Sequence, residues 1–281
     1  MNQTSPNPLA KHFRQPAIYL KLPSAGKFWP EDSLNLPANG EIAVYPMTTR
    51  DEITLRTPDA LMNGSGVVAV IQSCCPEIQN AWQMPSIDID AVIIAIRIAS
   101  YGHEMKFTNS CPHCKAVNDY AIDLRIVLES IRPGDFKSAV TSNKLSIKLC
   151  PQPYFAVNKT NQLQFEEQRL IKILEETEEQ PEIRSARINQ QMERIMAIGL
   201  DTMTNSTEYI EVDGEQVRNK EHIKEFYSNA DSRTVKAVQD RLAKIAEETS
   251  LRPIPVNCDE CTKPFEIQIN FDYASFFDSG F

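Results

Sequence analysis

Two Cys-x-x-Cys pairs stand far apart in this chain and constrain its fold more than any other feature. The first pair is Cys111 and Cys114, and the second is Cys258 and Cys261. Each pair follows a stretch that can form a strand and precedes a run in which apolar and polar residues alternate. This order predicts two hairpins, each with a cysteine-bearing turn, here called a knuckle, at its tip.

Four thiolates are the number that a tetrahedral structural zinc ion requires. Two residues between the cysteines of a pair let both sulfurs face one point, and a second pair completes the tetrahedron at Zn–S distances of roughly 2.3 Å. We therefore expect the two knuckles to share one closed, structural Zn²⁺ site and to form a zinc ribbon. The metal would then join stretches of chain that residues 115–257 separate.

Other interpretations of these cysteines are a redox motif and unrelated reduced thiols. A thioredoxin-type Cys-x-x-Cys opens a helix, whereas a strand-like run follows each pair here. His113 could replace one cysteine as a ligand, although a solvent-exposed loop histidine is the simpler interpretation. We interpret the remaining cysteines as small buried apolar residues; they are Cys74, Cys75 and Cys150.

Composition limits the classes of function. No apolar run in the 281 residues approaches the roughly 20 that a membrane helix needs, and the first residues show no signal-peptide pattern. The odd number of cysteines, seven, argues against a secreted disulfide framework. A net charge of −9 without a basic patch disfavours nucleic-acid binding.

We expect an α+β protein in which short strands and helices surround one buried helix. A polar arm, 1–16, precedes a core domain made of 17–150 and 250–281, which carries the zinc ribbon. The segment 151–249 is expected to be a mainly helical insertion with a short hairpin.

The buried helix is predicted over about 86–101, because its body is apolar nearly all round. Ser86 is its expected cap and Gly102 its stop. Arg97 in its body should find a carboxylate partner or reach outward along its stem. Before it, Thr49 with Glu52 fits a capping box.

Apolar periodicity and turn residues predict the elements of the central segment. Its methionines Met192, Met196 and Met203 are expected to fill the core. The predicted elements are a strand over 144–150, helices over 165–180, 182–199, 219–228 and 232–248, the last with Ser232 as cap, and a hairpin over 209–217 that turns at Asp213-Gly214.

Five aromatic residues crowd the last eleven positions, where a chain end normally frays. Such a density of aromatic surface is costly in water, so it either folds back on the core or docks on another chain. We favour docking and expect these residues to bind a partner: Phe271, Tyr273, Phe276, Phe277 and Phe281.

Catalytic motifs are missing. The sequence has no Gly-rich phosphate loop, no H-E-x-x-H, no G-x-S-x-G and only four scattered histidines. We therefore expect no enzymatic activity and no small-molecule substrate. Two alternatives stay open: a zinc-ribbon regulator that binds nucleic acid, and a thiol–disulfide oxidoreductase.

Several short motifs resemble, in their order, the baseplate hub assembly proteins of T-even-type contractile-tailed bacteriophages. They are L-P-S-A-G-K-F-W, Y-P-M-T-T-R-D-E, L-R-T-P-D-A-L-M-N-G, I-D-I-D-A-V-I-I-A-I-R-I-A-S-Y-G, C-P-H-C with a following I-D-L, and finally C-D-E-C with the aromatic ending. The resemblance covers roughly 17–130 and 252–281. It implies an assembly factor or structural component of the baseplate hub, with other phage baseplate and tail hub proteins as partners. It also implies location in the host cytoplasm during assembly, or in the tail baseplate of the virion.

Overall fold

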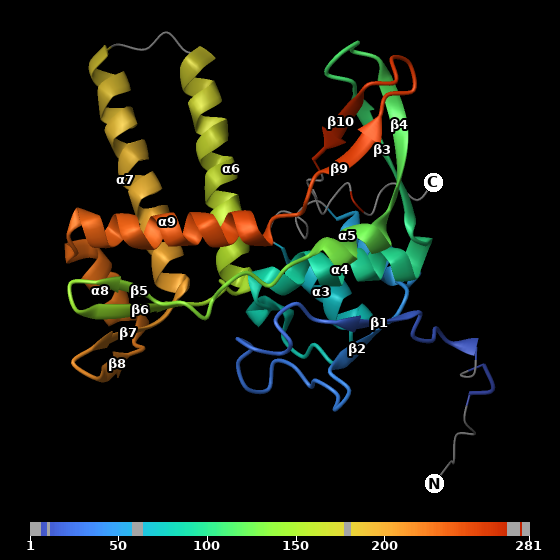
Figure 1. Cartoon of the computed structure of the whole chain (residues 1–281), viewed down its shortest axis with the longest axis horizontal. Coiled ribbons are helices and arrows are strands. Elements are labelled where there is room, and N and C mark those ends of the chain that lie inside the picture. The colour runs from blue at the N-terminus through green and yellow to red at the C-terminus, as the bar shows by residue number, and fades with distance from the viewer. Residues whose placement is uncertain (1–6, 10–11, 58–63, 177–180, 269–275, 277–281) are drawn as a thin grey trace.

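The computed structural model describes residues 7–9, 12–57, 64–176, 181–268 and 276. It has an α+β fold with four small antiparallel sheets, which confirms the predicted class. Figure 1 shows two packed units side by side, with a helical hairpin rising from one and a ribbon of strands rising from the other.

The larger unit surrounds α4 (Ser86–Tyr101), the predicted buried helix. The side chains of 91–96 on this helix are almost completely inaccessible to solvent. Around it lie the two-stranded sheet of β1 (Ile18–Lys21) and β2 (Glu41–Val44) and four short helical elements. These are α1 (Thr49–Leu55), α3 (Ser65–Cys74), the 3₁₀ helix η2 (Ala81–Gln83) and α5 (Leu124–Ser130).

The first turn of α4 differs from the prediction. Pro85, not Ser86, occupies the N-cap position, and no side chain caps the helix. The Ser86 N–H instead donates to the carbonyl of Gln152, 2.7 Å away, so a loop residue distant in sequence satisfies this end of α4. Gly102 ends the helix as expected, with φ 89°. Arg97 is buried, and its guanidinium lies over the Tyr101 ring at 4.6 Å from the centroid.

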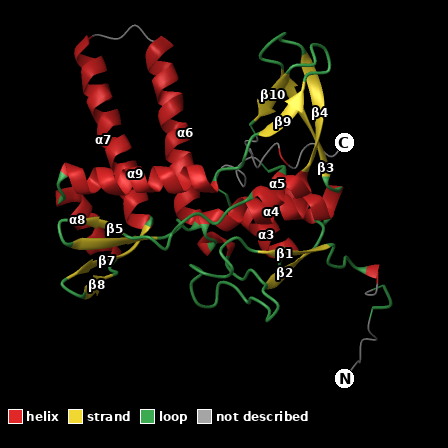
Figure 2. Ribbon diagram, viewed as in Figure 1, coloured by secondary structure: helices red, strands yellow, loops and turns green. Residues whose placement is uncertain are grey.

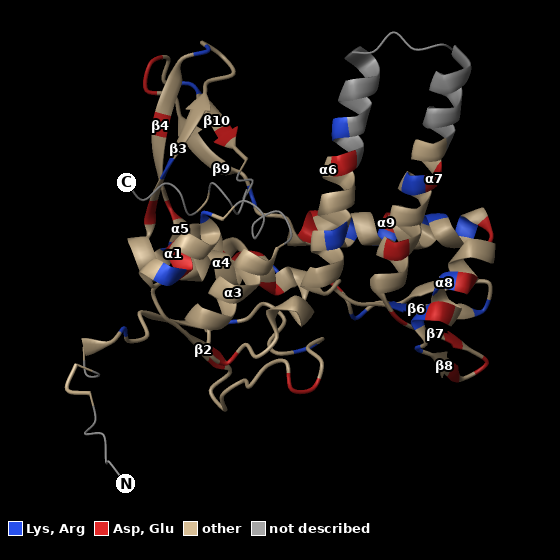
Figure 3. Cartoon of the chain, turned by 180° about the vertical axis from the view of Figure 1, so that it is seen from behind, with Lys and Arg blue, Asp and Glu red and all other residues tan. Residues whose placement is uncertain are grey.

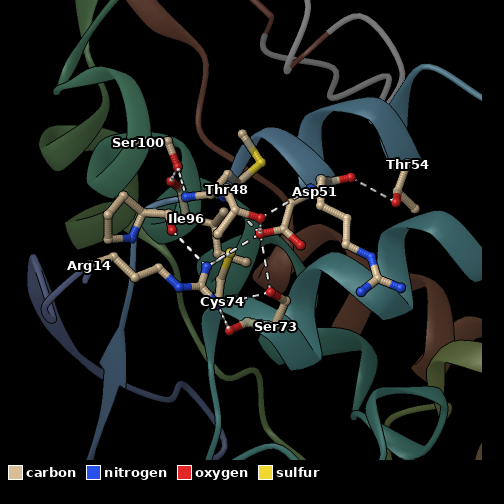
Figure 4. A network of polar contacts seen from close by, with 11 residues as sticks. Arg14, Thr48, Asp51, Thr54, Ser73, Cys74, Ile96 and Ser100 are labelled. Atoms are coloured by element: carbon tan, nitrogen blue, oxygen red, sulfur yellow. Dashed lines mark hydrogen bonds and ion pairs between the residues drawn. The ribbon is translucent and has the colours of Figure 1, made fainter. Parts of the chain in front are cut away.

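A capping box begins α1, one residue earlier than predicted. Thr48 is the N-cap, and its hydroxyl accepts from the N–H of Asp51, whose carboxylate in turn accepts from the Thr48 N–H at 2.8 Å. The same carboxylate oxygen also accepts from Ser73 at 3.1 Å and from Arg14 at 3.3 Å. Figure 4 shows these groups converging, so Arg14 ties the end of the arm to α1 and α3.

Replacing Thr48 with alanine is expected to lower the free energy of unfolding by about 1 kcal/mol, the usual effect of losing an N-cap oxygen. Urea unfolding measures the change. Thr49→Ala is the matched control, because Thr49 is the neighbouring threonine and does not cap the helix. Equal losses in the two variants would contradict the assignment of Thr48 as the cap.

The smaller unit is built on a four-stranded sheet with the order β5-β6-β7-β8. Ile147 and Leu149 of β6 are completely buried in its core, with Val238 of α9 and Ile223 of α8. β5 and β6 precede residue 150, yet β6 pairs with β7 rather than with any strand of the larger unit. The elements are β5 (Val140–Ser142), β6 (Leu145–Leu149), β7 (Thr207–Val212), β8 (Glu215–Val217), α8 (Lys220–Asn229) and α9 (Ser232–Thr249).

Two long helices, α6 (Tyr154–Glu176) and α7 (Pro181–Asn205), form the helical hairpin (Figure 1). Both begin earlier than predicted, and α7 also continues through Gly199. Met203, near the base, is buried in the core of the smaller unit. The core role predicted for the other two methionines is wrong, because Met192 is 55% and Met196 71% exposed on a part of α7 that projects away from the unit.

Candidate metal centre

The knuckles lie at the tips of two antiparallel hairpins, as the sequence predicts. β3 (Glu104–Ser110) pairs with β4 (Val117–Asp123), and β9 (Ile254–Asn257) pairs with β10 (Pro264–Ile267). The last pair of the first ladder is Ser110 with Val117, and that of the second is Asn257 with Pro264. The two loops, 111–116 and 258–263, therefore have the same length. Figure 2 shows the two hairpins together above α4 and α5.

Both knuckles have the same backbone conformation. In the first, the N–H of Cys111 donates to the carbonyl of Ala116 and the N–H of Lys115 donates to the carbonyl of Cys111. In the second, Cys258 donates to Lys263 and Thr262 donates to Cys258 in the same pattern. Lys115 and Thr262 both adopt positive φ, at 63° and 59°. The two halves of the site are thus repeats of one turn that face each other.

The four sulfurs converge across the two hairpins. Cys111 Sγ lies 3.7 Å from Cys261 Sγ, Cys114 Sγ lies 3.6 Å from Cys258 Sγ, and all four atoms lie within 4.8 Å of one another. A disulfide needs roughly 2.05 Å, and all seven cysteines are free thiols. A tetrahedron with Zn–S bonds of roughly 2.3 Å has S–S edges of about 3.8 Å. The cluster therefore has the size of a tetrathiolate metal site and can hold a metal ion.

Hydrogen bonds from backbone N–H groups favour the thiolate form of one cysteine in each knuckle. Hydrogen bonds from the N–H groups of Cys261 and Glu260 lower the pKa of Cys258 to about 6. Desolvation opposes ionisation of Cys111, but N–H groups from Cys114 and His113 outweigh it and lower that pKa too.

The pKa of Cys114 changes in the opposite direction. The Ala116 N–H favours its thiolate, yet desolvation and the three neighbouring sulfurs outweigh this bond and raise the pKa to about 12. Four negative charges this close repel one another, so complete ionisation of the cluster requires a cation at its centre.

Residues around the sulfurs hold the hairpins together. The rings of Tyr120 in β4 and Phe265 in β10 meet edge to face at 5.5 Å, and the Asn118 amide reaches Cys258 Sγ at 4.0 Å. The His113 ring lies in an exposed position with Nε2 3.4 Å from the Pro264 carbonyl. Asn118 lies one residue after the start of β4, and no motif in the sequence marks it as part of the site.

The other cysteines lie away from the cluster. Burial raises the pKa of Cys74 to about 12, that of Cys150 to about 11, and that of Cys75 well above its usual value. Among the residues that the structure describes, the four knuckle cysteines are the one group of three or more His, Cys, Asp or Glu side chains placed to hold a metal ion.

Of the five aromatic residues predicted to bind a partner, Phe276 falls within the described residues. It is 2% exposed and belongs to the core of the larger unit, so at this position the chain folds back on itself. The other four lie outside the described residues, and their partner-binding role stays a prediction: Phe271, Tyr273, Phe277 and Phe281.

A search of protein families finds a match over residues 18–278, nearly the whole chain, to the family described as T4 bacteriophage base plate protein. The chain belongs to this family. The match confirms the resemblance seen in the motifs and also spans the central segment, which those motifs leave uncovered. No curated protein and no solved structure matches the chain.

Family membership associates this base plate protein with a structural role in the phage tail and with tail proteins as partners. The stretches before and after the central segment form its cysteine cluster, and the family match includes both. In the described part of the chain, every helix is too short or too polar to cross a membrane.

Proposed function

We propose that this base plate protein acts without enzymatic activity in the assembly of the baseplate central hub, as an assembly factor or as a structural component. The convergence of four distant thiols in a chain of this family carries the proposal. The site has four sulfur ligands and no open position, which suits a structural metal and leaves no place for substrate. Its partners would be other baseplate and tail hub proteins, met in the host cytoplasm and retained in the virion tail if it is a hub component.

The metal is zinc in this proposal, because soft thiolates in tetrahedral array favour zinc over the oxygen-seeking cations. Cys111, Cys114, Cys258 and Cys261 would bind it, and the bound ion would supply charge compensation and a rigid link between the hairpins. The Tyr120–Phe265 contact would set how the hairpins face each other around the ion.

Two observations argue against the alternative functions. Each Cys-x-x-Cys lies in a turn between strands, whereas a thioredoxin-type pair opens a helix. In Figure 3, acidic and basic residues are mixed along the described elements, and no continuous basic face is visible in this view. A nucleic-acid-binding surface would concentrate Lys and Arg.

Inactivating the gene in a phage tests the proposed function. We expect infected cells to accumulate tail components without complete baseplates, and we expect wild-type protein supplied in trans to restore them. Cys111→Ser should fail to restore assembly, because the metal site loses a ligand, whereas Lys236→Glu should succeed, because Lys236 is exposed on α9 and lies outside both the cysteine cluster and the groove between the units. Electron microscopy and plaque counts measure both outcomes. Normal baseplates without the protein would refute the proposal.

A further inference from the structure

A groove of about 810 Å³ opens where the two units meet. The loop after β1 supplies one wall through Lys27, Phe28 and Trp29, and Phe155 and Lys220 supply part of the other. Its volume falls within the ~300–1,000 Å³ of typical ligand sites. No sequence motif marks this groove, although Lys27, Phe28 and Trp29 belong to the first motif shared with the baseplate family.

Part of the lining is apolar and stiff. Phe28 is 37% and Phe155 41% exposed, which is unusual for large aromatic side chains. Four prolines also line the groove: Pro30, Pro85, Pro151 and Pro153. Because these rings lose little conformational freedom on binding, they suit an extended peptide that lays apolar side chains between them.

The loop that presents Phe28 is held in a strained conformation. Ala25, Phe28 and Asp32 all have positive φ, at 52°, 68° and 61°, a region that residues other than glycine rarely adopt. Asp88 of α4 fixes the loop by accepting hydrogen bonds from Ser24 and Trp29. The groove wall is therefore formed in advance of binding.

Charge defines the kind of partner. Arg218 in the groove is paired with Glu208 at 3.0 Å. The Lys220 ammonium donates to two backbone carbonyls, those of Thr204 and Thr207. Within the described part of the chain, neither Lys27 nor Lys220 forms an ion pair with a carboxylate. The groove lining thus carries three cations, Lys27, Arg218 and Lys220, against one carboxylate, Glu208, a local excess of positive charge in a chain of net charge −9.

We propose that this groove binds an extended acidic peptide segment of a partner protein, with prolyl or aromatic residues between its carboxylates. The carboxylates would pair with Lys27 and Lys220, and the apolar residues would contact Phe28 and Phe155. The proposal goes beyond the hub role and does not depend on it, because no cysteine of the metal centre lines the groove.

A synthetic peptide tests this groove on the full-length, zinc-loaded protein. The probe is DPFDPFD-amide with a fluorescent label on its N-terminal amine, and the comparison probe carries lysine at every aspartate. We expect the acidic probe to bind with a Kd below about 1 mM and the basic probe not to bind. Added salt should weaken binding, because exposed charges are screened.

Two variants locate the binding. Lys27→Glu should weaken the acidic probe about tenfold, since it replaces attraction by repulsion. Phe155→Ala should also weaken it severalfold through lost contact. Lys236→Glu is the matched control, an equal charge change on the exposed face of α9 outside the groove, and its Kd should stay within about twofold of wild type. Circular dichroism checks that each variant folds.

Three results would each overturn the proposal: no binding of the acidic probe up to about 1 mM, equal binding of the basic probe, or equal effects of Lys27→Glu and Lys236→Glu. None of them bears on the metal centre or on baseplate assembly, which the complementation experiment measures separately.

Discussion

Cys258→Ser is expected to remove bound zinc and to destabilise the protein by more than about 3 kcal/mol. Cys258 is buried between the hairpins, and its Sγ lies 3.6 Å from that of Cys114. Serine cannot supply a thiolate at this position, so three ligands would remain for an ion that needs four. Elemental analysis and thermal unfolding measure the two effects.

The expected loss of stability is large because strand pairing does not link the two hairpins. They form separate two-stranded sheets, and no ladder hydrogen bond joins them. A two-stranded hairpin alone is marginally stable in water. Structural zinc contributes about 10–16 kcal/mol of apparent binding free energy in zinc-finger peptides, as much as the whole stability of a typical domain. The metal is therefore expected to hold the ribbon together.

Cys150→Ser is the control for this experiment, because it removes a partly buried thiol that lies outside the cluster. It should keep one zinc per chain and lose little stability. A chelator added to wild-type protein should reproduce the Cys258→Ser melt. The zinc assignment is wrong if wild-type protein purified without chelators contains no zinc, or if Cys258→Ser melts like wild type.

The cysteine cluster could be predicted because its signals are local. The two-residue spacing positions each pair, and alternation after Cys114 and after Cys261 indicates the strands that carry the knuckles. Ligand number alone predicts that the two pairs meet, and the sulfur distances agree with this prediction. Asn118 and the Tyr120–Phe265 contact depend on how the hairpins face each other, and no local pattern encodes that arrangement.

The residues at which helices begin also depend partly on the local sequence and partly on contacts with distant parts of the chain. Thr48 and Thr49 are adjacent candidates for one cap, and the choice depends on Asp51, which also accepts from Ser73 and Arg14. At α4, the carbonyl of Gln152, 66 positions beyond Ser86, replaces the expected side-chain cap. Local sequence thus predicts where each of these helices begins to within one residue, and tertiary contacts determine the residue at which it begins.

Local sequence patterns do not predict which strands pair across long stretches of chain. β6 pairs with β7, although both helices of the hairpin lie between them in sequence. The apolar stripe on α7 indicates a helix, but it cannot reveal that Met192 and Met196 stay exposed, because exposure depends on how far the helix extends past its unit. The pattern shows which residues share a face, and only the packing shows what covers it.

Replacing Asp88 with alanine is expected to lower the free energy of unfolding by about 3 kcal/mol. Asp88 is completely buried and accepts from the N–H and hydroxyl of Ser24 and from Nε1 of Trp29, at 2.8, 2.5 and 2.9 Å. Each donor left unpaired costs roughly 1–3 kcal/mol, and part of that loss is offset because a carboxylate no longer has to be desolvated. Fluorescence of the two tryptophans, both in the larger unit, follows its unfolding.

The pH dependence provides an independent signature of Asp88. Desolvation raises its pKa from 3.8 to about 6, so the folded protein binds this proton more tightly than the unfolded chain. The resulting stabilisation is complete below pH 3.8 and is lost as pH rises through about 6. Between pH 7.5 and pH 5, wild type should therefore gain about 1.4 kcal/mol relative to Asp88→Asn, which keeps the shape but cannot titrate.

Comparing the two proteins at each pH cancels the titration of the cysteines and of the surface carboxylates, since both proteins share them. Asp123 and Asp135, whose partners Arg125 and Ser138 lower their pKa values to about 2, would otherwise weaken the fold in strong acid. A constant difference in unfolding free energy between wild type and Asp88→Asn from pH 7.5 to pH 5 would contradict the raised pKa. If Asp88→Ala were as stable as wild type at pH 7.5, Asp88 could not be the residue that holds the Ser24–Trp29 loop in place.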